Sequence, residues 1–327
     1  MKTILITSTG CPGGYDLIMN LKKYRYRIIA VDMDDRVISK HIADAFYTVP
    51  SYDSPDYISE IISICKKEKV DLIFPESSYE IEVLSKNKDI IESNGIILMA
   101  SDYDALHIAN NKYETYNKLI ENKFIPNFML FNGYIENFLY RFGYPEKKVC
   151  IKPAFSKGGR GFKIIDATKS REDIINQRNN KYTTLDFIKD IYFKDYLIME
   201  YLEGEEIDSM VLCYKGEALV ITHKTREKEN RGTITYGELV DRPELDRKIK
   251  EILKVIPLSF NVSIQFKGGK LIEINPRTST YVWNEYFSEP VLSIELAFGI
   301  KPDIIKESQK IVPIGRKMIR YFKQYCW

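Results

Sequence analysis

The sequence lacks long apolar runs, paired cysteine motifs and an excess of charge of either sign. Nowhere do about 18 apolar residues follow one another, the length a helix needs to cross a bilayer, so we expect no membrane-spanning helix. The 48 Lys and Arg residues nearly balance the 46 Asp and Glu residues, giving a net charge of +2, which disfavours a dedicated nucleic-acid binder. The five cysteines are widely spaced and form no C-x-x-C pair. We therefore expect reduced thiols and a cytoplasmic protein rather than a disulfide framework or a zinc site.

The first residues also lack the apolar core of a signal peptide. The run Ile4-Leu5-Ile6 ends after three residues and meets Gly10, Pro12, Gly13 and Gly14, which predicts a strand that enters a loop. With 327 residues, 44% of them hydrophobic, the chain is long enough for two or three globular domains. We find no tandem repeat and no low-complexity tract.

Apolar runs and helical patterns alternate over the first third of the chain. Strands are predicted at 3–7, 27–32, 70–74 and 96–99, and helices at 15–23, 57–67 and 79–86. Because alternating strands and helices form βαβ units, residues 1–110 are predicted to be an α/β domain with a parallel sheet.

The glycine-rich turn after the first strand invites a comparison with dinucleotide-binding loops, especially since Asp32 closes the second strand. However, Gly10, Gly13 and Gly14 do not have the G-x-G-x-x-G spacing. A tight turn at the carboxyl edge of a parallel sheet explains the loop equally well. Cys11 is predicted to be a turn residue rather than a nucleophile, because no sequence signal supplies it with a base.

The next segment combines lysines with a glycine-rich turn. A helix at 111–120 carries Lys112, a strand at 149–153 carries Lys152, and the turn at 156–161 precedes another strand. Backbone N–H groups of such a turn can point at phosphate oxygens, and Lys152 could add a point charge, although a lysine at a strand end is usually solvated. The polar stretch 166–195 is predicted to be a solvated helical excursion.

Two further segments place oxygen-bearing side chains near strand ends. The segment 197–206 places carboxylates around a turn after a buried strand, although acidic loops are usually just solvated. A hairpin follows at 262–277, in which Glu273 and Asn275 share one face that Gln265 can join. Three such side chains within apolar strands would be costly without a cation or a hydrogen-bonding partner. Oxygen ligands with one carboxylate suit Mg²⁺ that is shared with nucleotide phosphates.

Taken in order, these features resemble the ATP-grasp superfamily, in particular the synthetase modules of the carbamoyl-phosphate synthase large subunit and stand-alone carboxylate–amine ligases of that type. The resemblance rests on Lys112, Lys152-Pro153, the Gly-Gly-Arg-Gly turn, the stretch from Glu200 to Glu206, and Gln265 with Glu273-Ile274-Asn275-Pro276-Arg277. It covers nearly the whole chain. It implies a Rossmann-like parallel-sheet domain at 1–110, followed by an ATP-grasp domain with a small lobe at 111–203 and a large lobe at 204–327.

The resemblance also implies the nucleotide contacts. Lys112 and Lys152 correspond to the basic residues that contact ATP phosphates. The residues expected to cover the phosphates are the loop glycines Gly158, Gly159 and Gly161. Those expected around the adenine and ribose are Glu200, Tyr201, Leu202 and Glu206.

By the same resemblance, Gln265, Glu273 and Asn275 correspond to ligands of Mg²⁺, with Mn²⁺ as an alternative metal. Many relatives carry an acid where Gln265 stands. Arg277 is expected to steady the transferring phosphoryl group and, with Lys152, to act in catalysis. The segment Thr278–Tyr281 departs from the more basic or serine-rich sequence of many relatives, and no amidotransferase pattern is evident, which disfavours carbamoyl-phosphate synthesis.

The implied activity is an ATP-dependent ligation of a small carboxylic acid to an amine through an acylphosphate, with release of ADP and phosphate. The alternative is a kinase of the same fold that phosphorylates a carboxylate, carbamate or amide nitrogen and forms no amide. A non-catalytic ATP-binding module is disfavoured by the intact set of motifs. Relatives of this kind are often homodimers, and neither a nucleic acid nor a membrane is expected as a partner.

Each of two polar segments can be interpreted in more than one way. The stretch 223–233 is either a solvated face or a grip on the substrate carboxylate through Arg226 and Arg231, and His223 is a weaker candidate for proton transfer. The basic, aromatic stretch 316–327 could contact a membrane or a nucleic acid. A final strand or helix packed on the ATP-grasp domain is the favoured interpretation. The sequence leaves the acid, the amine and the oligomeric state open.

Overall fold

The computed structural model describes residues 1–327 except 157–158, 177–180, 231–232, 280, 282 and 322–327. The chain divides into two units, and each is described by itself. The first contains Met1–Asn110, Ile207–Gln265 and Ile274–Trp327, and the second contains Asn111–Glu206 and Phe266–Glu273.

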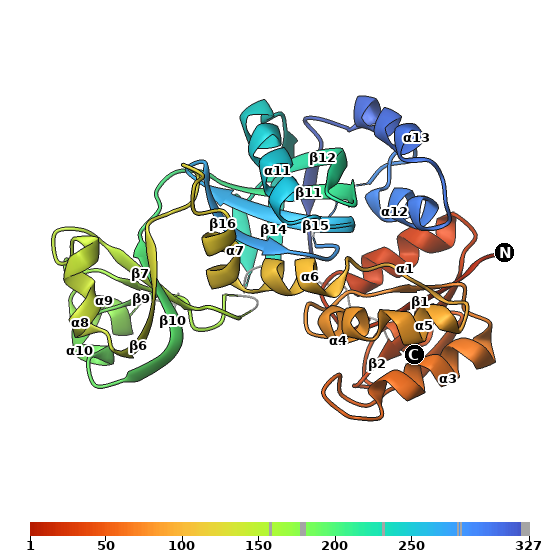
Figure 1. The fold of residues 1–327 in the computed structure, drawn as a ribbon, viewed down its shortest axis with the longest axis horizontal. Helices are drawn as coiled ribbons and strands as arrows, with labels where there is room; N and C mark the ends of the chain where they lie inside the picture. Colours follow the sequence, from red (N-terminus) through yellow and green to blue (C-terminus); the bar gives the residue numbers. More distant parts are fainter. Residues whose placement is uncertain (157–158, 177–180, 231–232, 280, 282, 322–327) are drawn as a thin grey trace. The chain divides into compact units, whose positions relative to one another are not determined.

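The first unit begins with the predicted alternation of strands and helices (Figure 1). Its elements up to Asn110 are β1 (Thr3–Ile6), α1 (Gly14–Lys23), β2 (Arg27–Asp32), α2 (Ser39–Ile42), β3 (Ala45–Thr48), α3 (Tyr57–Glu68), β4 (Leu72–Phe74), α4 (Glu80–Lys86), α5 (Lys88–Ser93), β5 (Ile97–Leu98) and α6 (Tyr103–Asn110). The strand order is β3-β2-β1-β4-β5, with parallel pairing throughout. The predicted parallel sheet is therefore confirmed.

Strand β1 lies at the centre of this sheet and is buried on both faces. Ile4 and Ile6 pack into one hydrophobic cluster with residues of α1, whereas Leu5 packs into another with residues of α3. Successive side chains of a strand point to opposite faces, so a central parallel strand needs an unbroken apolar run. This requirement explains why the sequence run at 3–7 predicted the strand correctly.

A second sheet lies mostly in the first unit, although its residues Phe266–Glu273 belong to the second unit. Its elements are β11 (Glu206–Tyr214), β12 (Glu217–Thr225), β13 (Lys228–Asn230), β14 (Thr233–Val240), α11 (Pro243–Val255), β15 (Phe260–Lys267), β16 (Lys270–Asn275), α12 (Glu289–Ala297), α13 (Pro302–Glu307), the 3₁₀ turn η2 (Ser308–Ile311) and β17 (Lys317–Ile319). The strand order is β13-β14-β12-β11-β15-β16, and β17 pairs with β14. The final strand expected within 316–327 is thus confirmed over Lys317–Ile319.

The two sheets of the first unit are joined through α12 and the loop before β15. Val291 and Ile294 of α12 pack into the cluster that holds Ile4 and Ile6, and α1 and α12 lie side by side in Figure 1. Ser101 Oγ donates a hydrogen bond to the carbonyl oxygen of Ser259 and accepts one from its N–H, each at 2.9 Å. These contacts hold the N-terminal sheet and the second sheet in one unit.

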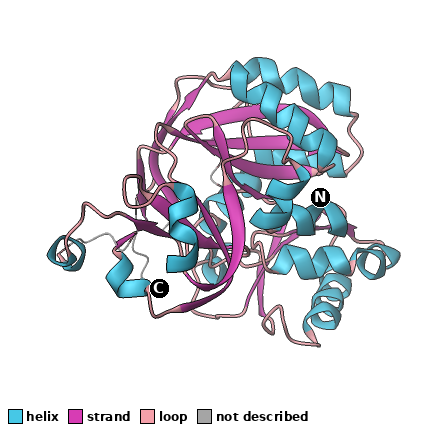
Figure 2. Ribbon diagram, turned by 60° about the vertical axis from the view of Figure 1, so that its left-hand side comes forward, coloured by secondary structure: helices cyan, strands magenta, loops and turns pink. Residues whose placement is uncertain are grey.

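The second unit contains a mixed sheet with short helices. Figure 2 distinguishes the helices and strands of the protein by colour. The elements of the second unit are α7 (Lys112–Lys118), β6 (Phe128–Tyr134), α8 (Glu136–Leu139), the 3₁₀ turn η1 (Tyr140–Phe142), β7 (Val149–Pro153), β8 (Lys163–Ile165), α9 (Arg171–Ile175), β9 (Tyr182–Thr183), α10 (Leu185–Ile188) and β10 (Tyr192–Glu200). The strand order is β6-β10-β7-β8-β9. The prediction for 166–195 was wrong in part, because β9 joins the sheet and β10 begins at Tyr192.

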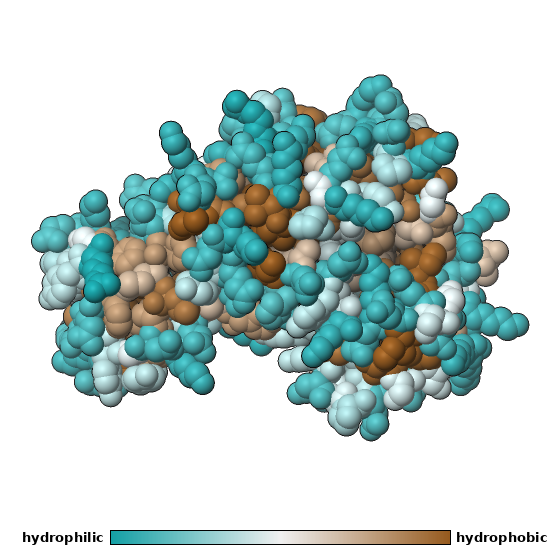
Figure 3. Space-filling view, in the orientation of Figure 1, coloured by the Kyte–Doolittle hydropathy of each residue, from teal (hydrophilic) through white to brown (hydrophobic). Residues whose placement is uncertain are grey.

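The described helices include none that is long and apolar enough to span a membrane. On the face in Figure 3, hydrophobic surface is broken into separate areas with polar residues between them. The exposed large apolar side chains are likewise distributed over many elements, among them Met33, Tyr140 and Ile304.

Candidate active site

Two lysines and a carboxylate meet in the second unit. Lys112 is the first residue of α7, whose N-cap Asn111 accepts hydrogen bonds from Tyr113 N and Glu114 N. The Nζ atom of Lys112 lies 3.5 Å from Glu273 Oε2 on β16. It donates a hydrogen bond to the carbonyl oxygen of Ser156 at 2.9 Å. The helix start and the hairpin therefore bring together residues that are far apart in the sequence.

Lys152 is held on β7 in the same surroundings. It is 4% exposed, and its Nζ donates hydrogen bonds to Tyr116 Oη and to the carbonyl oxygen of Ile272, each at 3.0 Å. Burial is the main cause that lowers the pKa of Lys152 to about 7, with the charge of Lys112 acting in the same direction and Glu273 opposing it. An anion bound beside Lys152 would favour its charged form.

Sequence reasoning did not single out Tyr116, which braces this lysine. Tyr116 lies four residues after Lys112 on α7, and its hydroxyl also donates to the carbonyl oxygen of Ile272 at 2.6 Å. Residues four apart lie on one face of a helix, so the spacing from Lys112 was the signal that could have found it.

We expect Lys152→Met to raise the free energy of unfolding near pH 7, even if it abolishes function. The unfolded chain binds the lysine proton up to its ordinary pKa of 10.5, whereas the folded chain releases it near pH 7. The stability of the parental protein should therefore rise with pH between these values. Urea unfolding at about pH 7 and about pH 9 should show the gain of the variant shrinking at the higher pH. The exposed Lys194→Met on β10 is the control, and an equal gain at both pH values would contradict the prediction.

The structure describes the glycine-rich turn at 156–161 except for residues 157 and 158. Gly159 and Gly161 have positive φ angles of 69° and 75°. A Cβ at Gly161 would lie 2.8 Å from Pro153 Cγ and 2.9 Å from Tyr196 Oη, whereas one at Gly159 would meet nothing within 4 Å. Gly161 is therefore required by packing as well as by its backbone conformation, and Gly158 lies outside the described residues.

The residues predicted to surround the adenine, Glu200, Tyr201 and Leu202, lie at the end of β10 and directly after it. Glu200 Oε1 accepts hydrogen bonds from Asn127 N at 2.8 Å and from Lys270 Nζ at 2.5 Å, so this carboxylate connects β10 to the start of β6 and to the hairpin. Tyr201 and Leu202 pack against a small hydrophobic cluster in the same unit. The ammonium group of Lys148 lies 5.4 Å from the centre of the Tyr201 ring.

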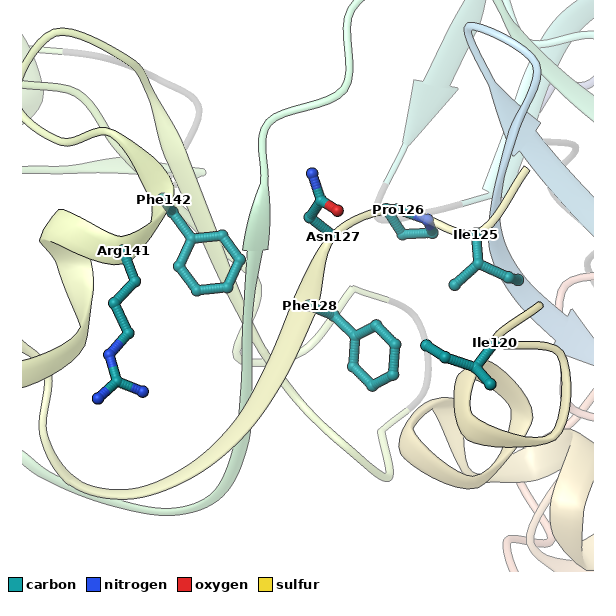
Figure 4. Close-up of a pocket in the computed structure, with 7 residues that line it drawn as sticks. All are labelled: Ile120, Ile125, Pro126, Asn127, Phe128, Arg141 and Phe142. Atoms are coloured by element: carbon teal, nitrogen blue, oxygen red, sulfur yellow. The ribbon is translucent and has the colours of Figure 1, made fainter. Parts of the chain in front are cut away.

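A hollow of about 390 Å³ lies elsewhere in the second unit (Figure 4). The residues that line it are Ile120, Ile125, Pro126, Asn127, Phe128, Arg141 and Phe142. None of the predicted site residues lines this hollow, so we do not assign the nucleotide to it.

The predicted metal ligands are divided between the two units. Glu273 belongs to the second, whereas Gln265 and Asn275 belong to the first, where they are 9% and 6% exposed. Glu273 and Asn275 stand two residues apart on β16, and Glu206 is the first residue of β11. Within the described part of the chain, no three His, Cys, Asp or Glu side chains gather as a metal site. One carboxylate with amide oxygens fits a cation whose remaining ligands come from phosphates.

Arg277 follows β16 in the first unit and is fixed by two hydrogen bonds. Its Nε donates to Ser78 Oγ and its Nη1 to the carbonyl oxygen of Thr278, each at 2.7 Å. The charge of Arg277 also acts on Glu76 and on Cys11. Sequence reasoning missed Glu76, although its place two residues after the end of β4, at the carboxyl edge of a parallel sheet, is where ligand-binding side chains are expected.

Polar side chains of the segment 223–233 form hydrogen bonds within the first unit. Arg226 Nη2 donates to Glu229 Oε2 at 2.9 Å, and Arg231 lies outside the described residues. His223 is 4% exposed, and its Nδ1 and Nε2 lie 2.8 Å from Ser209 Oγ and from Asp246 Oδ1 respectively. Through these two contacts, His223 connects its own strand β12 to β11 and α11.

Comparison with known proteins adds two family models and several solved structures. Residues 4–99 match the model of a PylC-like N-terminal domain, and residues 192–284 match that of an ATP-grasp in the biosynthetic pathway with the Ter operon. The chain resembles pyruvate carboxylase from Rhizobium etli at 16% identity with a TM-score of 0.66; the match covers 97% of this chain and 30% of that enzyme. This chain therefore spans less than a third of that protein.

Two further structures are similar over most of both chains. One is the biotin carboxylase domain of 2-oxoglutarate carboxylase from Hydrogenobacter thermophilus, solved with MgADP and bicarbonate, at 17% identity and a TM-score of 0.62, covering 92% of this chain and 70% of that one. The other is an L-amino acid ligase from Bacillus licheniformis, at 11% identity and a TM-score of 0.58, covering 85% and 67%. At these identities the likeness concerns the fold.

Proposed function

We propose that the chain is an ATP-dependent ligase that joins a small carboxylic acid to an amine, which the match of residues 192–284 to an ATP-grasp family model supports. The observation that carries the proposal is the meeting of Lys112, Lys152 and Glu273 in the second unit. Two buried ammonium groups beside one carboxylate are costly unless an anion balances them. Nucleotide phosphates supply that anion, and they also supply further oxygen ligands for a cation on Glu273.

The proposed reaction follows from the weakness of a carboxylate as an electrophile. Transfer of the γ-phosphoryl group of ATP to a carboxylate oxygen gives an acylphosphate and ADP. The neutral amine nitrogen then attacks the acyl carbon and releases one proton, the bond from that carbon to the bridging oxygen breaks, and phosphate leaves. Catalysis of this kind consists mainly of positioning and charge neutralisation.

The roles of the residues follow from their chemistry. Lys112 and Lys152 bind phosphate oxygens, and Arg277 binds the oxygens of the acylphosphate. Glu273 and Asn275, with Gln265, would hold Mg²⁺ or Mn²⁺, which when bound neutralises charge on the phosphates. The turn that contains Gly159 and Gly161 contributes backbone N–H groups.

Two further properties belong to this proposal. We place the protein in the cytoplasm because the cysteines that the structure describes, Cys11, Cys65, Cys150 and Cys213, are free thiols, as is usual in a reducing compartment. We also propose a homodimer, in keeping with the dimer reported for the biotin carboxylase domain from Hydrogenobacter thermophilus.

The test is ADP and phosphate release from the purified protein with Mg-ATP and pools of small carboxylic acids and amines, with mass spectrometry of each active pool. We expect a product whose mass equals acid plus amine less water, formed with one ADP and one phosphate. A phosphorylated product without a condensed mass would instead indicate a kinase. No ADP release from any pool would contradict catalysis on these substrates.

A further inference from the structure

The hydroxyl group of Tyr116 lies between a lysine of β7 and the backbone of β16. Lys152 Nζ donates a hydrogen bond to Tyr116 Oη at 3.0 Å, and Tyr116 Oη lies 2.6 Å from the carbonyl oxygen of Ile272. The same carbonyl oxygen accepts a hydrogen bond from Lys152 Nζ at 3.0 Å. Tyr116 is fully buried, and Lys152 is 4% exposed. The three groups therefore form a closed set of hydrogen bonds inside the second unit.

The direction of each hydrogen bond follows from the chemistry of the groups. A charged ammonium group only donates and a carbonyl oxygen only accepts, whereas a phenol hydroxyl has one proton to donate and can also accept. Tyr116 therefore accepts from Lys152 and gives its single proton to a carbonyl oxygen. The carbonyl oxygen of Ile272 at 2.6 Å is nearer than that of Leu271 at 3.3 Å. A lone pair of the Tyr116 oxygen is thus fixed toward Lys152.

This arrangement leaves one donor of Lys152 for a ligand. A charged lysine has three N–H donors, and Tyr116 and Ile272 accept from two of them. Within the part of the chain that the structure describes, no third group accepts from this ammonium. A buried donor without an acceptor is costly, and a phosphate oxygen, which is a charged acceptor, forms a strong hydrogen bond with it.

Lys152 shares its surroundings with a second cation and one carboxylate. Glu273 follows Ile272 directly on β16, and Glu273 Oε2 lies 3.5 Å from Lys112 Nζ. The third titratable group that acts on Lys152 is the Cys150 thiol, whose pKa is raised by burial to about 12, so that it is neutral near pH 7. One negative charge therefore accompanies two positive ones, and a phosphate would balance the excess.

The aromatic ring of Tyr116 is itself held by Phe128 at the start of β6. The centres of the two rings lie 5.1 Å apart at an interplanar angle of 63°, which is an edge-to-face contact. The ammonium group of Lys152 lies 5.2 Å from the centre of the Tyr116 ring. Phenylalanine at position 116 would keep both contacts and lose only the hydroxyl group. Tyr116→Phe is therefore the variant that isolates the hydrogen bonds.

We propose that Tyr116 is a positioning residue for the nucleotide, whose hydroxyl group directs the remaining N–H of Lys152 toward a phosphate oxygen. This proposal rests on the proposed function, in which Lys152 binds the phosphates. Without the hydroxyl group, the ammonium keeps one acceptor, the carbonyl oxygen of Ile272, and its flexible stem can turn about that single bond. Loss of the second acceptor therefore weakens the hold of Lys152 on a phosphate.

The binding experiment compares the parental protein with Tyr116→Phe, using Mg²⁺ and the non-hydrolysable ATP analogue β,γ-imido-ATP in calorimetric titrations. We expect the variant to bind the analogue roughly 10-fold more weakly, the scale of one hydrogen bond to a charged group. Tyr113→Phe is the matched control. Tyr113 lies on the same helix, and its ring also packs against Phe128, with the ring centres 6.2 Å apart. This control should bind the analogue as the parental protein does.

A double-mutant cycle tests whether Tyr116 acts through Lys152. If it does, Tyr116→Phe should weaken binding little further once Lys152→Met has removed the ammonium group. A role in packing alone would give the same loss with either residue at position 152. Parental affinity in Tyr116→Phe, an equal loss in Tyr113→Phe, or additive losses in the double variant would each overturn the proposal.

These titrations use neither acid nor amine, so their outcome is separate from that of ligation. If the analogue binds through Tyr116 and Lys152 but no condensed product forms with any pool, the ligase function fails and the role of Tyr116 stands. If ligation is observed and Tyr116→Phe binds the analogue with parental affinity, only the role of Tyr116 fails. A parental protein that does not bind the analogue would overturn both.

Discussion

Replacing Glu273 by Gln is expected to lower acid-dependent ADP release by roughly 100- to 1000-fold, the scale of losing a preorganised charge in a reaction site. Glu273 lies 3.5 Å from Lys112 Nζ and supplies the one carboxylate of the predicted metal set. Glutamine has the same shape and keeps an oxygen atom, so the variant removes charge with little change in packing. Initial rates at saturating Mg-ATP measure the effect.

The same variant separates binding from catalysis. Loss of the carboxylate weakens the hold on the cation, so raising the Mg²⁺ concentration should restore part of the rate. Glu217→Gln is the matched control, because Glu217 forms an ion pair with Lys306 at 2.6 Å on the surface of the first unit. Parental rates in Glu273→Gln would show that the metal assignment is wrong, and an equal loss in Glu217→Gln would indicate a general effect on folding.

Glu76→Gln is expected to make the free protein more stable above neutral pH and to leave its stability unchanged in mild acid. Burial raises the pKa of Glu76 to about 7 from its ordinary value of 4.5, although the charges of Arg277 and Arg320 and a hydrogen bond from Cys11 oppose the rise. Folding above pH 7 therefore requires a buried carboxylate to carry its charge. The corresponding upper bound on the gain is about 3 kcal/mol.

The sign follows from proton binding. Between pH 4.5 and about 7 the folded protein holds the Glu76 proton more tightly than the unfolded chain does, so its stability falls as the pH rises through this window. Glutamine cannot ionise and avoids that fall. Urea unfolding of both proteins at about pH 4, where the carboxyl is protonated in both states, and at about pH 8 should therefore give equal midpoints in acid and a higher midpoint for the variant in base.

Glu68→Gln provides a control of opposite sign. Hydrogen bonds from Tyr47 and Arg27 lower the pKa of Glu68, so its charged form stabilises the folded protein above its ordinary pKa of 4.5. We expect Glu68→Gln to lower the unfolding midpoint at the higher pH, where Glu76→Gln raises it. Equal midpoints of Glu76→Gln and the parental protein at both pH values would contradict the burial of a charged Glu76.

Much of the fold could be predicted because its signals are local. The strands β1, β2 and β4 are short apolar runs, and α3 carries apolar residues at helical spacing, so each could be found without knowledge of its neighbours. The hairpin of β15 and β16 was equally clear from its Lys-Gly-Gly-Lys turn. The segment 166–195 was harder, because β9 has two residues and is a strand only through its pairing with β8.

The residues of the candidate site also fall into those that could be predicted from the sequence and those that could not. Lys112, Lys152 and Glu273 were found from motifs, and the structure brings these three together in the second unit. The assignment of the full site to a nucleotide and a metal stays a prediction. The partners of Glu200 and His223 could not be predicted, because Lys270 and Asp246 become their neighbours only through the packing of strands and α11.

The sequence by itself determined the parallel N-terminal domain, the order of the ATP-grasp motifs and the residue types available for chemistry, since periodicity and turn residues act over a few neighbouring positions. Only the tertiary structure decided the protonation properties of Lys152 and the hydrogen bond from Cys11 to Glu76. Burial and long-range proximity set these features. Neither burial nor proximity is encoded at a single position, because both arise when distant segments pack against one another.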